Sequence, residues 1–453
     1  MYFAPVNGYY KKILRLSLPA IAGLSTQMIL SLVDTAMVGR LPNAEYALAA
    51  MGLGVLATWA LVSFFSSLAT GTHVLIARKY GSSDFDGCGN VLNNSLMVSF
   101  VMGIIVAVFA LTAAHPFAQF FSADKKVGDY AGEFIFYRFL GLPFFLLTVS
   151  YRGFFFGIGK TKIFMISAIM VNILNIIFNY FLIFGVWGAP KMGVAGSGFG
   201  SSLATVCDAA FYFIMSVRPK YRTKFRYFKN IKVDFSIIKE IYKISLPVSF
   251  QNVFILLGFL AFIAIAGLIG IKEQAASQGI FTTMFMSFLP CFGFGIAVQT
   301  LVGNSLGAGK RKLAMIYGFE TAKIATYYTL TLGLVFIIFP EHILSIITND
   351  ASIIEVAKTG LRIAGFAQIF YATGVVLSNG LQSAGNTFFV MAAEGSANLL
   401  VFVPLSYFLG KYLGLGFAGA WAALPVYIIL YSALIYWKFR FGKWKSDTNI
   451  KHG

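Results

Sequence analysis

The chain has 453 residues, of which 58% are hydrophobic and only 11% are charged, and its mean hydropathy is +0.78. This composition excludes a string of soluble domains and predicts a polytopic all-α membrane protein. The net charge of +18 does not indicate nucleic-acid binding, because the basic residues lie in short segments between apolar stretches, where they orient helices and meet anionic lipid. Cys88, Cys207 and Cys291 have no metal-binding spacing, so neither a disulfide framework nor a zinc site is predicted.

The first apolar stretch, SLPAIAGLSTQMILSLVDTAMVGRL (Ser17–Leu41), is long enough to cross a bilayer and contains one carboxylate, Asp34. Lys11, Lys12 and Arg15 precede it, which predicts that the span starts in the cytoplasm. Asp34 then lies roughly 28 Å beyond Arg15, in the outer part of the span. A low dielectric disfavours a charged carboxylate, so Asp34 can take up and release a proton; the alternative is a solvated helix end.

Hydropathy and helix length predict twelve spans in total. They are expected at roughly 13–38, 46–75, 91–113, 131–156, 163–186, 193–217, 241–270, 275–303, 313–339, 355–380, 387–410 and 416–438. The longest basic segment between spans is Arg218–Lys243. Together with the other basic loops it predicts that both termini are cytoplasmic.

The two halves of the chain repeat each other. LSLPA at Leu16–Ala20 returns as ISLPV at Ile244–Val248, and Asn172 corresponds to Asn398. Because each copy contains six spans, an even number, the two copies have the same orientation and are expected to be related by an axis along the membrane normal. We therefore predict an N-lobe at 1–217, a basic cytoplasmic linker at 218–240, a C-lobe at 241–440 and a cytoplasmic tail at 441–453. Two such lobes suit alternating access around a central cavity.

Polar residues on the fifth span are the next candidates. Asn175 and Asn179 share one helix face because they are four residues apart, and Asn172 lies one turn earlier. Their amides can accept a hydrogen bond from a protonated carboxyl or offer carbonyl oxygen to a cation. The competing interpretation is hydrogen bonding between helices.

The position of the second half that corresponds to Asp34 falls close to Phe262 and has no acid. Its candidate is Glu394, an isolated acid in an apolar stretch. Uncharged side chains that could join it in the cavity are Gln251, Gln278 and Gln368. Glu320 and Lys323 are three residues apart and are interpreted as a structural pair. Asp208 is either a water-accessible inner residue or a partner for a basic group.

No enzyme constellation is present in the sequence. GFFFGIGKT at Gly153–Thr161 imitates a phosphate-binding loop, but its glycine spacing is one residue too long and it follows a membrane helix. The four histidines are scattered and predict no metal site. We expect no cofactor.

Several segments together resemble the MATE (multidrug and toxic compound extrusion) transporters, most closely their DinF branch. These are SLPA…VDTAMVGRL, the Gly-rich GSSDFDG and GAGKRK, GIGKTK, and GVAGSG at the start of the sixth span. The resemblance covers essentially the whole chain. It implies export of organic, often cationic compounds in exchange for H⁺ or Na⁺.

The resemblance also assigns roles to residues. Asp34 falls on the family's first-span acid, whose protonation alternates with substrate, and Asn175 falls on the fifth-span Asn of the same site. Asn179 stands where some members have Asp, and the seventh and tenth spans lack the acids of the NorM branch. This pattern favours H⁺ coupling over Na⁺.

We therefore expect an antiporter for a small organic substrate, working as a monomer in the inner or plasma membrane without a nucleic-acid partner. The alternatives are a Na⁺-coupled drug exporter and a lipid-linked precursor flippase of the same superfamily. The flippase would need several basic cavity residues. A passive channel is a more distant alternative, because the paired lobes favour rocking. A membrane transferase is also more distant, because it would need an acidic metal-binding pair or a His/Asp cluster and the sequence shows neither.

Overall fold

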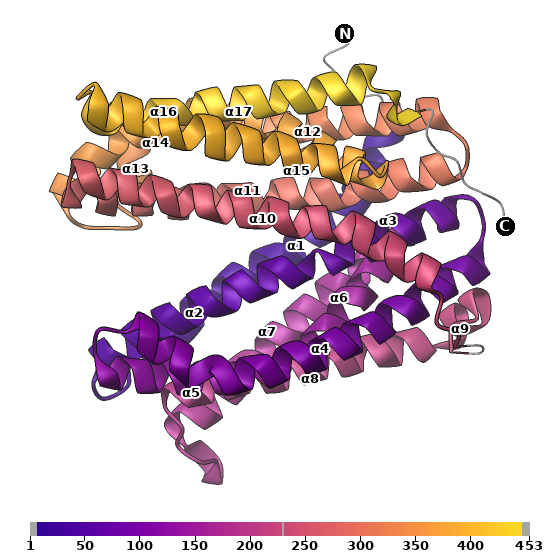
Figure 1. Cartoon of the computed structure of the whole chain (residues 1–453), viewed down its shortest axis with the longest axis horizontal. Coiled ribbons are helices and arrows are strands. Elements are labelled where there is room, and N and C mark those ends of the chain that lie inside the picture. Colours follow the sequence, from indigo (N-terminus) through magenta and orange to yellow (C-terminus); the bar gives the residue numbers. More distant parts are fainter. Residues whose placement is uncertain (1–6, 229–230, 446–453) are drawn as a thin grey trace. The chain divides into compact units, whose positions relative to one another are not determined.

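The computed structural model describes residues 7–228 and 231–445, and within these ranges the chain is helical with no strand (Figure 1). The sequence-predicted tail at 441–453 thus lies partly outside the described residues. Helices of the first half are α1 (Asn7–Val38), α2 (Ala44–Ser66), α3 (Leu68–Gly81), α4 (Phe85–Phe121), α5 (Lys125–Phe139), α6 (Leu142–Gly157), α7 (Thr161–Phe184), α8 (Val194–Val217) and α9 (Pro219–Phe225). Helices of the second half are α10 (Phe235–Ile269), α11 (Ile271–Gly307), α12 (Arg311–Ile338), α13 (Pro340–Leu344), α14 (Ala351–Ser383), α15 (Thr387–Gly395), α16 (Val403–Tyr407) and α17 (Gly416–Phe441).

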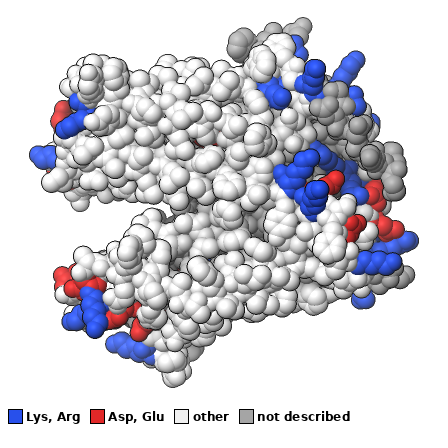
Figure 2. Space-filling model, in the orientation of Figure 1, with Lys and Arg blue, Asp and Glu red and all other residues white. Residues whose placement is uncertain are grey.

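The predicted spans are recovered in order. Among the described residues, eleven helical segments are long and apolar enough to cross a membrane, and the bent pair α5 and α6 makes a twelfth. Figure 2 shows the same pattern on one face, where charged side chains gather at the helix ends and the long middle stretches are uncharged. The all-α membrane architecture is therefore confirmed.

The fourth of these segments along the chain, the pair α5 and α6, bends by 48°. A bend frees backbone groups, which must find other partners in an apolar environment. Ser202 of α8 supplies them: its hydroxyl lies 2.7 Å from the Tyr137 carbonyl and 2.9 Å from the Arg138 carbonyl, and it accepts the Gly141 N–H at 3.1 Å. The end of α5 is thereby tied to α8.

Two helices end in tight turns at glycines that are 226 residues apart, the offset that also relates Asn172 to Asn398. Gly159 and Gly385 have left-handed φ angles of 71° and 82°, which favour glycine. After α6, the Gly159 and Lys160 N–H groups donate back to Phe156 and Phe155 carbonyls at 2.9 and 2.7 Å. This is a helix-ending Schellman turn, so the sequence that imitates a phosphate-binding loop is a C-cap.

Contacts divide the chain into two compact units. One runs from Ala22 to Leu246, and the other contains the chain up to Ile21 and from Pro247 onward. The boundaries of these units differ from the lobe boundaries expected at 217 and 241. The first part of α1 packs with the second half of the chain, and the first part of α10 packs with the first half. We call them the N-terminal unit and the C-terminal unit.

Glycines account for this packing. A Cβ at Gly293 of α11 would lie 2.3 Å from Ile21, and one at Gly71 of α3 would lie 2.7 Å from the Ile241 carbonyl. The absence of a side chain lets each helix approach its neighbour closely. Each unit also has its own buried apolar clusters; in the C-terminal unit, Phe262 stacks on Phe402 at 5.1 Å and meets Trp421 edge-on at 5.0 Å.

Candidate functional site

Asp34 lies in the last turn or so of α1, within the N-terminal unit, and is half-buried. Its carboxylate oxygen Oδ1 accepts a hydrogen bond from Nδ2 of Asn179 on α7, with an N–O distance of 2.8 Å. This contact brings together two residues that are 145 positions apart in the chain. The sequence-predicted pairing of the first-span acid with the fifth-span amides is thus present in the geometry.

The two α7 amides form a short chain of hydrogen bonds behind Asp34. Asn179 Nδ2 also donates to Oδ1 of Asn175 at 2.8 Å, and Asn175 Nδ2 donates to the hydroxyl of Ser201 on α8 at 2.9 Å. Both asparagines are buried, as the four-residue spacing requires for side chains on one inward face. Both hydrogens of the Asn179 amide are therefore engaged, one of them by Asp34.

The remaining oxygen of Asn179 is a buried acceptor with no hydrogen-bond partner. It faces Gly200 of α8, where an added Cβ would lie 2.2 Å away. Gly200 is therefore required for α8 to approach α7 this closely. Sequence reasoning missed Ser201 and Gly200, because nothing in the composition of α8 marks these two positions among its many small residues.

A positive charge accompanies the acid. Arg138, at the end of α5, interacts electrostatically with Asp34. Its backbone is held by the Ser202 hydroxyl at the α5–α6 bend. The sequence does not reveal this proximity of Arg138 to Asp34, since it depends on the bend.

Other sequence-predicted residues lie elsewhere. Asn172 is buried on α7, and its Nδ2 has no hydrogen-bond partner. In the C-terminal unit, Gln278 is exposed, whereas the buried Gln368 donates to the Ser287 hydroxyl of α11. Glu394 and Gln251 do come together there, in a separate cluster described below.

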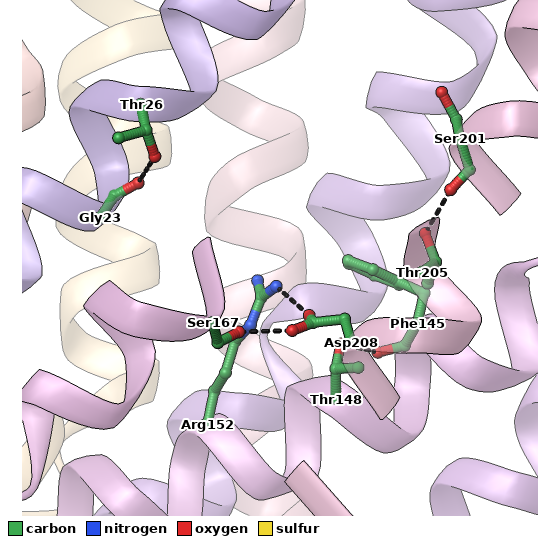
Figure 3. Close-up of polar contacts among 9 residues, drawn as sticks. All are labelled: Gly23, Thr26, Phe145, Thr148, Arg152, Ser167, Ser201, Thr205 and Asp208. Atoms are coloured by element: carbon green, nitrogen blue, oxygen red, sulfur yellow. Dashed lines mark hydrogen bonds and ion pairs between the residues drawn. The ribbon is translucent and has the colours of Figure 1, made fainter. Parts of the chain in front are cut away.

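Two further charged groups are structural pairs. Arg152 of α6 lies 3.0 Å from Asp208 of α8, and the Ser167 hydroxyl of α7 donates to the same carboxylate (Figure 3). Glu320 and Lys323 of α12 pair at 2.6 Å, as their spacing predicts. Asp208 therefore has the basic partner that was one of its two interpretations.

Asp34 is contacted by a nitrogen donor and lies near a positive charge. Among the described residues no group of three or more His, Cys, Asp or Glu side chains could hold a metal. Asp34 is bonded to an amide N–H donor and lies near a guanidinium, whereas hard cations need several oxygen ligands. What the site can do is change its charge by one unit within an otherwise uncharged hydrogen-bonded network.

Comparisons with known proteins define the class. The family model MatE matches residues 19–181 and matches again at residues 247–408, which recovers the internal repeat. The chain therefore belongs to the MatE family, a family of membrane transporters and not of enzymes.

Individual relatives agree. A probable multidrug resistance protein NorM of Thermotoga maritima is 27% identical over 96% of this chain and 93% of its own length. NorM of Pseudomonas putida is also 27% identical, over 94% of this chain and 93% of its own. A solved MOP superfamily transporter of Pyrococcus furiosus has the same fold, with a TM-score of 0.88 at 21% identity over 95% of both chains.

Proposed function

We propose that this chain is a proton-coupled antiporter of the DinF branch that exports organic, drug-like, often cationic compounds by alternating access. Supporting this proposal are its membership of the MatE family and the names of relatives such as the NorM proteins, which are called multidrug resistance proteins. The assignment of Asp34 as the coupling residue is supported by its hydrogen bond from Asn179 and by the nearby charge of Arg138.

The coupling follows from charge. With Asp34 ionised, its charge and that of Arg138 balance, and the surrounding amides are neutral. When a proton binds Asp34, the charge of Arg138 is no longer compensated, so a cationic substrate is repelled. Two unit charges a few ångströms apart interact by a few kcal/mol at an effective dielectric constant near 20, so the proton and the substrate compete for the site. Each charge that moves inward contributes about 2.3 kcal/mol per 100 mV of membrane potential.

Proton coupling is favoured over Na⁺ coupling by the residue at position 179. A carboxylate there would supply a second anionic oxygen ligand, but the amide of Asn179 presents N–H to Asp34. Arg138 opposes a bound metal cation as well. Asn175 and Asn179 accordingly position Asp34, and we propose Asn172 as a secondary polar residue on the same helix.

We further propose that both termini are cytoplasmic, that the protein resides in the plasma or inner membrane and that the monomer is functional. The lipid-linked precursor flippase is the alternative. It is disfavoured because two interior arginines of the N-terminal unit are already engaged, Arg138 by Asp34 and Arg152 by Asp208.

The test is efflux from everted membrane vesicles that carry the full-length protein. Addition of an organic cation should collapse an imposed ΔpH in the wild type, with or without Na⁺, and should fail in Asp34→Asn. The variant keeps an oxygen that can accept from Asn179, so folding should be retained. Asp86→Asn, which changes an exposed acid at the start of α4, is the matched control and should behave as wild type. Normal efflux by Asp34→Asn contradicts the assignment, and dependence on Na⁺ favours the sodium-coupled alternative.

A further inference from the structure

The C-terminal unit contains a buried acid that the exchange at Asp34 does not use. Glu394 lies near the end of α15, and only 3% of its surface is exposed. Within residues 7–228 and 231–445 it makes no ion pair. A charged carboxylate buried without a cation is costly, so its environment must supply hydrogen bonds or the group must take up a proton.

The environment supplies neutral donors. The Tyr427 hydroxyl of α17 donates to Oε1 of Glu394, and Tyr431 of the same helix also bonds to the carboxylate. Gln251 of α10 contributes a further hydrogen bond. Its own oxygen already accepts from Gln382 Nε2 at 3.0 Å, so the amide nitrogen is the group left for Glu394.

No positively charged side chain of the described residues interacts with Glu394. The other titratable groups around it are Tyr371 of α14, which interacts with Glu394, and Cys291 of α11, which interacts with Tyr371. Both are neutral at ordinary pH. A metal cation here would meet N–H and O–H donors, whereas a proton needs no cage of oxygen ligands.

The segment after Glu394 contains an unused acceptor. Ser396–Phe402 is π-helical, and such segments occur often at functional sites. Asn398 in this segment forms a side-chain hydrogen bond with Glu394. The buried oxygen Oδ1 of Asn398 has no hydrogen-bond partner. An added Cβ at Gly258 of α10 would lie 1.6 Å from that oxygen, so the amide fills the space left by glycine.

We propose that Glu394 is a second proton-binding site, located in the C-terminal unit and built by Gln251, Asn398, Tyr427 and Tyr431. On protonation the carboxyl becomes a donor, and the Asn398 amide can turn its unused oxygen toward it. The π-helical segment is the element able to accommodate this change. The role of the site in transport rests on the proposed function, but the protonation itself does not.

Infrared spectroscopy tests the protonation without any transport assay. Full-length protein in lipid is titrated, and the C=O stretch of a protonated carboxyl is followed with its shift in D₂O. The background variant is Asp34→Asn, which removes the other candidate acid. We expect a titrating carboxyl band that persists in Asp34→Asn and disappears in Asp34→Asn/Glu394→Gln. Glu320→Gln, at a buried acid that is paired with Lys323, is the matched control and should leave the band intact.

The proposal is overturned if every carboxyl band of Asp34→Asn is still present in Asp34→Asn/Glu394→Gln. If Glu394→Gln fails to fold, Tyr427→Phe replaces it and should move the pH at which the band appears, because one donor to the carboxylate is lost. The exposed Tyr407→Phe should leave that pH in place. An unmoved band in Tyr427→Phe also overturns the proposal. Efflux by Asp34→Asn is scored separately, so the two proposals can fail independently.

Discussion

Asn179 of α7 donates to Asp34 of α1 across an N–O distance of 2.8 Å, and the same amide nitrogen donates to Asn175. The amide nitrogen can therefore stabilise the charged form of Asp34 but cannot accept its proton. The free acceptor of the group, Oδ1, points to Gly200. This contact joins α1 and α7 at the site and makes the amide the donor and the carboxylate the acceptor.

Replacing Asn179 by Asp should make efflux respond to Na⁺. Two carboxylates at this distance cannot both be ionised easily, so they share a proton or bind a cation between them. We expect Na⁺ to stimulate Asn179→Asp about fivefold, which corresponds to roughly 1 kcal/mol. Asn172→Asp adds the same charge to the same helix without a bond to Asp34 and should stay insensitive. A folded Asn179→Asp that ignores Na⁺ would contradict the role of residue 179.

Replacing Gly200 by Ala should disturb the site through packing alone. The new Cβ would lie 2.2 Å from Asn179 Oδ1, so the amide or α8 must move. We expect a loss of about 1–3 kcal/mol in stability, as for other overpacked sites, together with reduced efflux. Thermal unfolding in detergent and ΔpH collapse measure the two effects. Gly52→Ala in α2, where the added Cβ meets nothing within 4 Å, should leave both unchanged.

Replacing Asp208 by Asn should destabilise the N-terminal unit strongly. The change leaves the mostly buried Arg152 charge without its carboxylate partner, which lies 3.0 Å away. Loss of one member of a buried pair costs about 3–5 kcal/mol. Asp86→Asn breaks an exposed pair with Arg226 and should cost only about 0–1 kcal/mol. Equal melting temperatures for the two variants would show that the buried pair is dispensable.

The start of α4 should weaken in acid. Partial burial acts to raise the pKa of Asp84, but hydrogen bonds from Lys79 and from the Gly87 N–H, together with the Lys79 charge, lower that pKa below 3.8. Because the folded pKa is the lower one, the stabilisation is full above the unfolded pKa of about 3.9 and is lost as pH falls through the folded value.

Hydrogen exchange of the first turn of α4, corrected for intrinsic rates, measures this effect. Protection should hold from neutral pH down to about pH 5 and fall below about pH 4 in the wild type. Asp84→Asn keeps a capping acceptor and should lose the pH dependence. Acid-sensitive protection that persists in Asp84→Asn would assign the effect to another group.

The two halves place their acids differently. The repeat offset puts Phe262 where Asp34 stands, and Phe262 is packed among Phe402 and Trp421 instead of amides. Conversely, Glu394 corresponds to Ala168 of α7. The N-terminal unit thus carries its acid in an amide network near the end of α1, and the C-terminal unit carries its acid among tyrosines.

Hydropathy alone determined the all-helical membrane architecture and the twelve spans, because each span must satisfy its own backbone and bury apolar surface over a fixed length. Matching segments in the two halves of the sequence determined the repeat. It also singled out Asp34, since a carboxylate is costly within such a span. Only the tertiary structure decided which polar groups meet that acid. Ser201, Gly200 and Arg138 reach the site through the α5–α6 bend and the close approach of α8 to α7, and hydropathy contains no information about either. The same holds for the division of α1 between two units, which depends on the contacts that Gly71 and Gly293 allow.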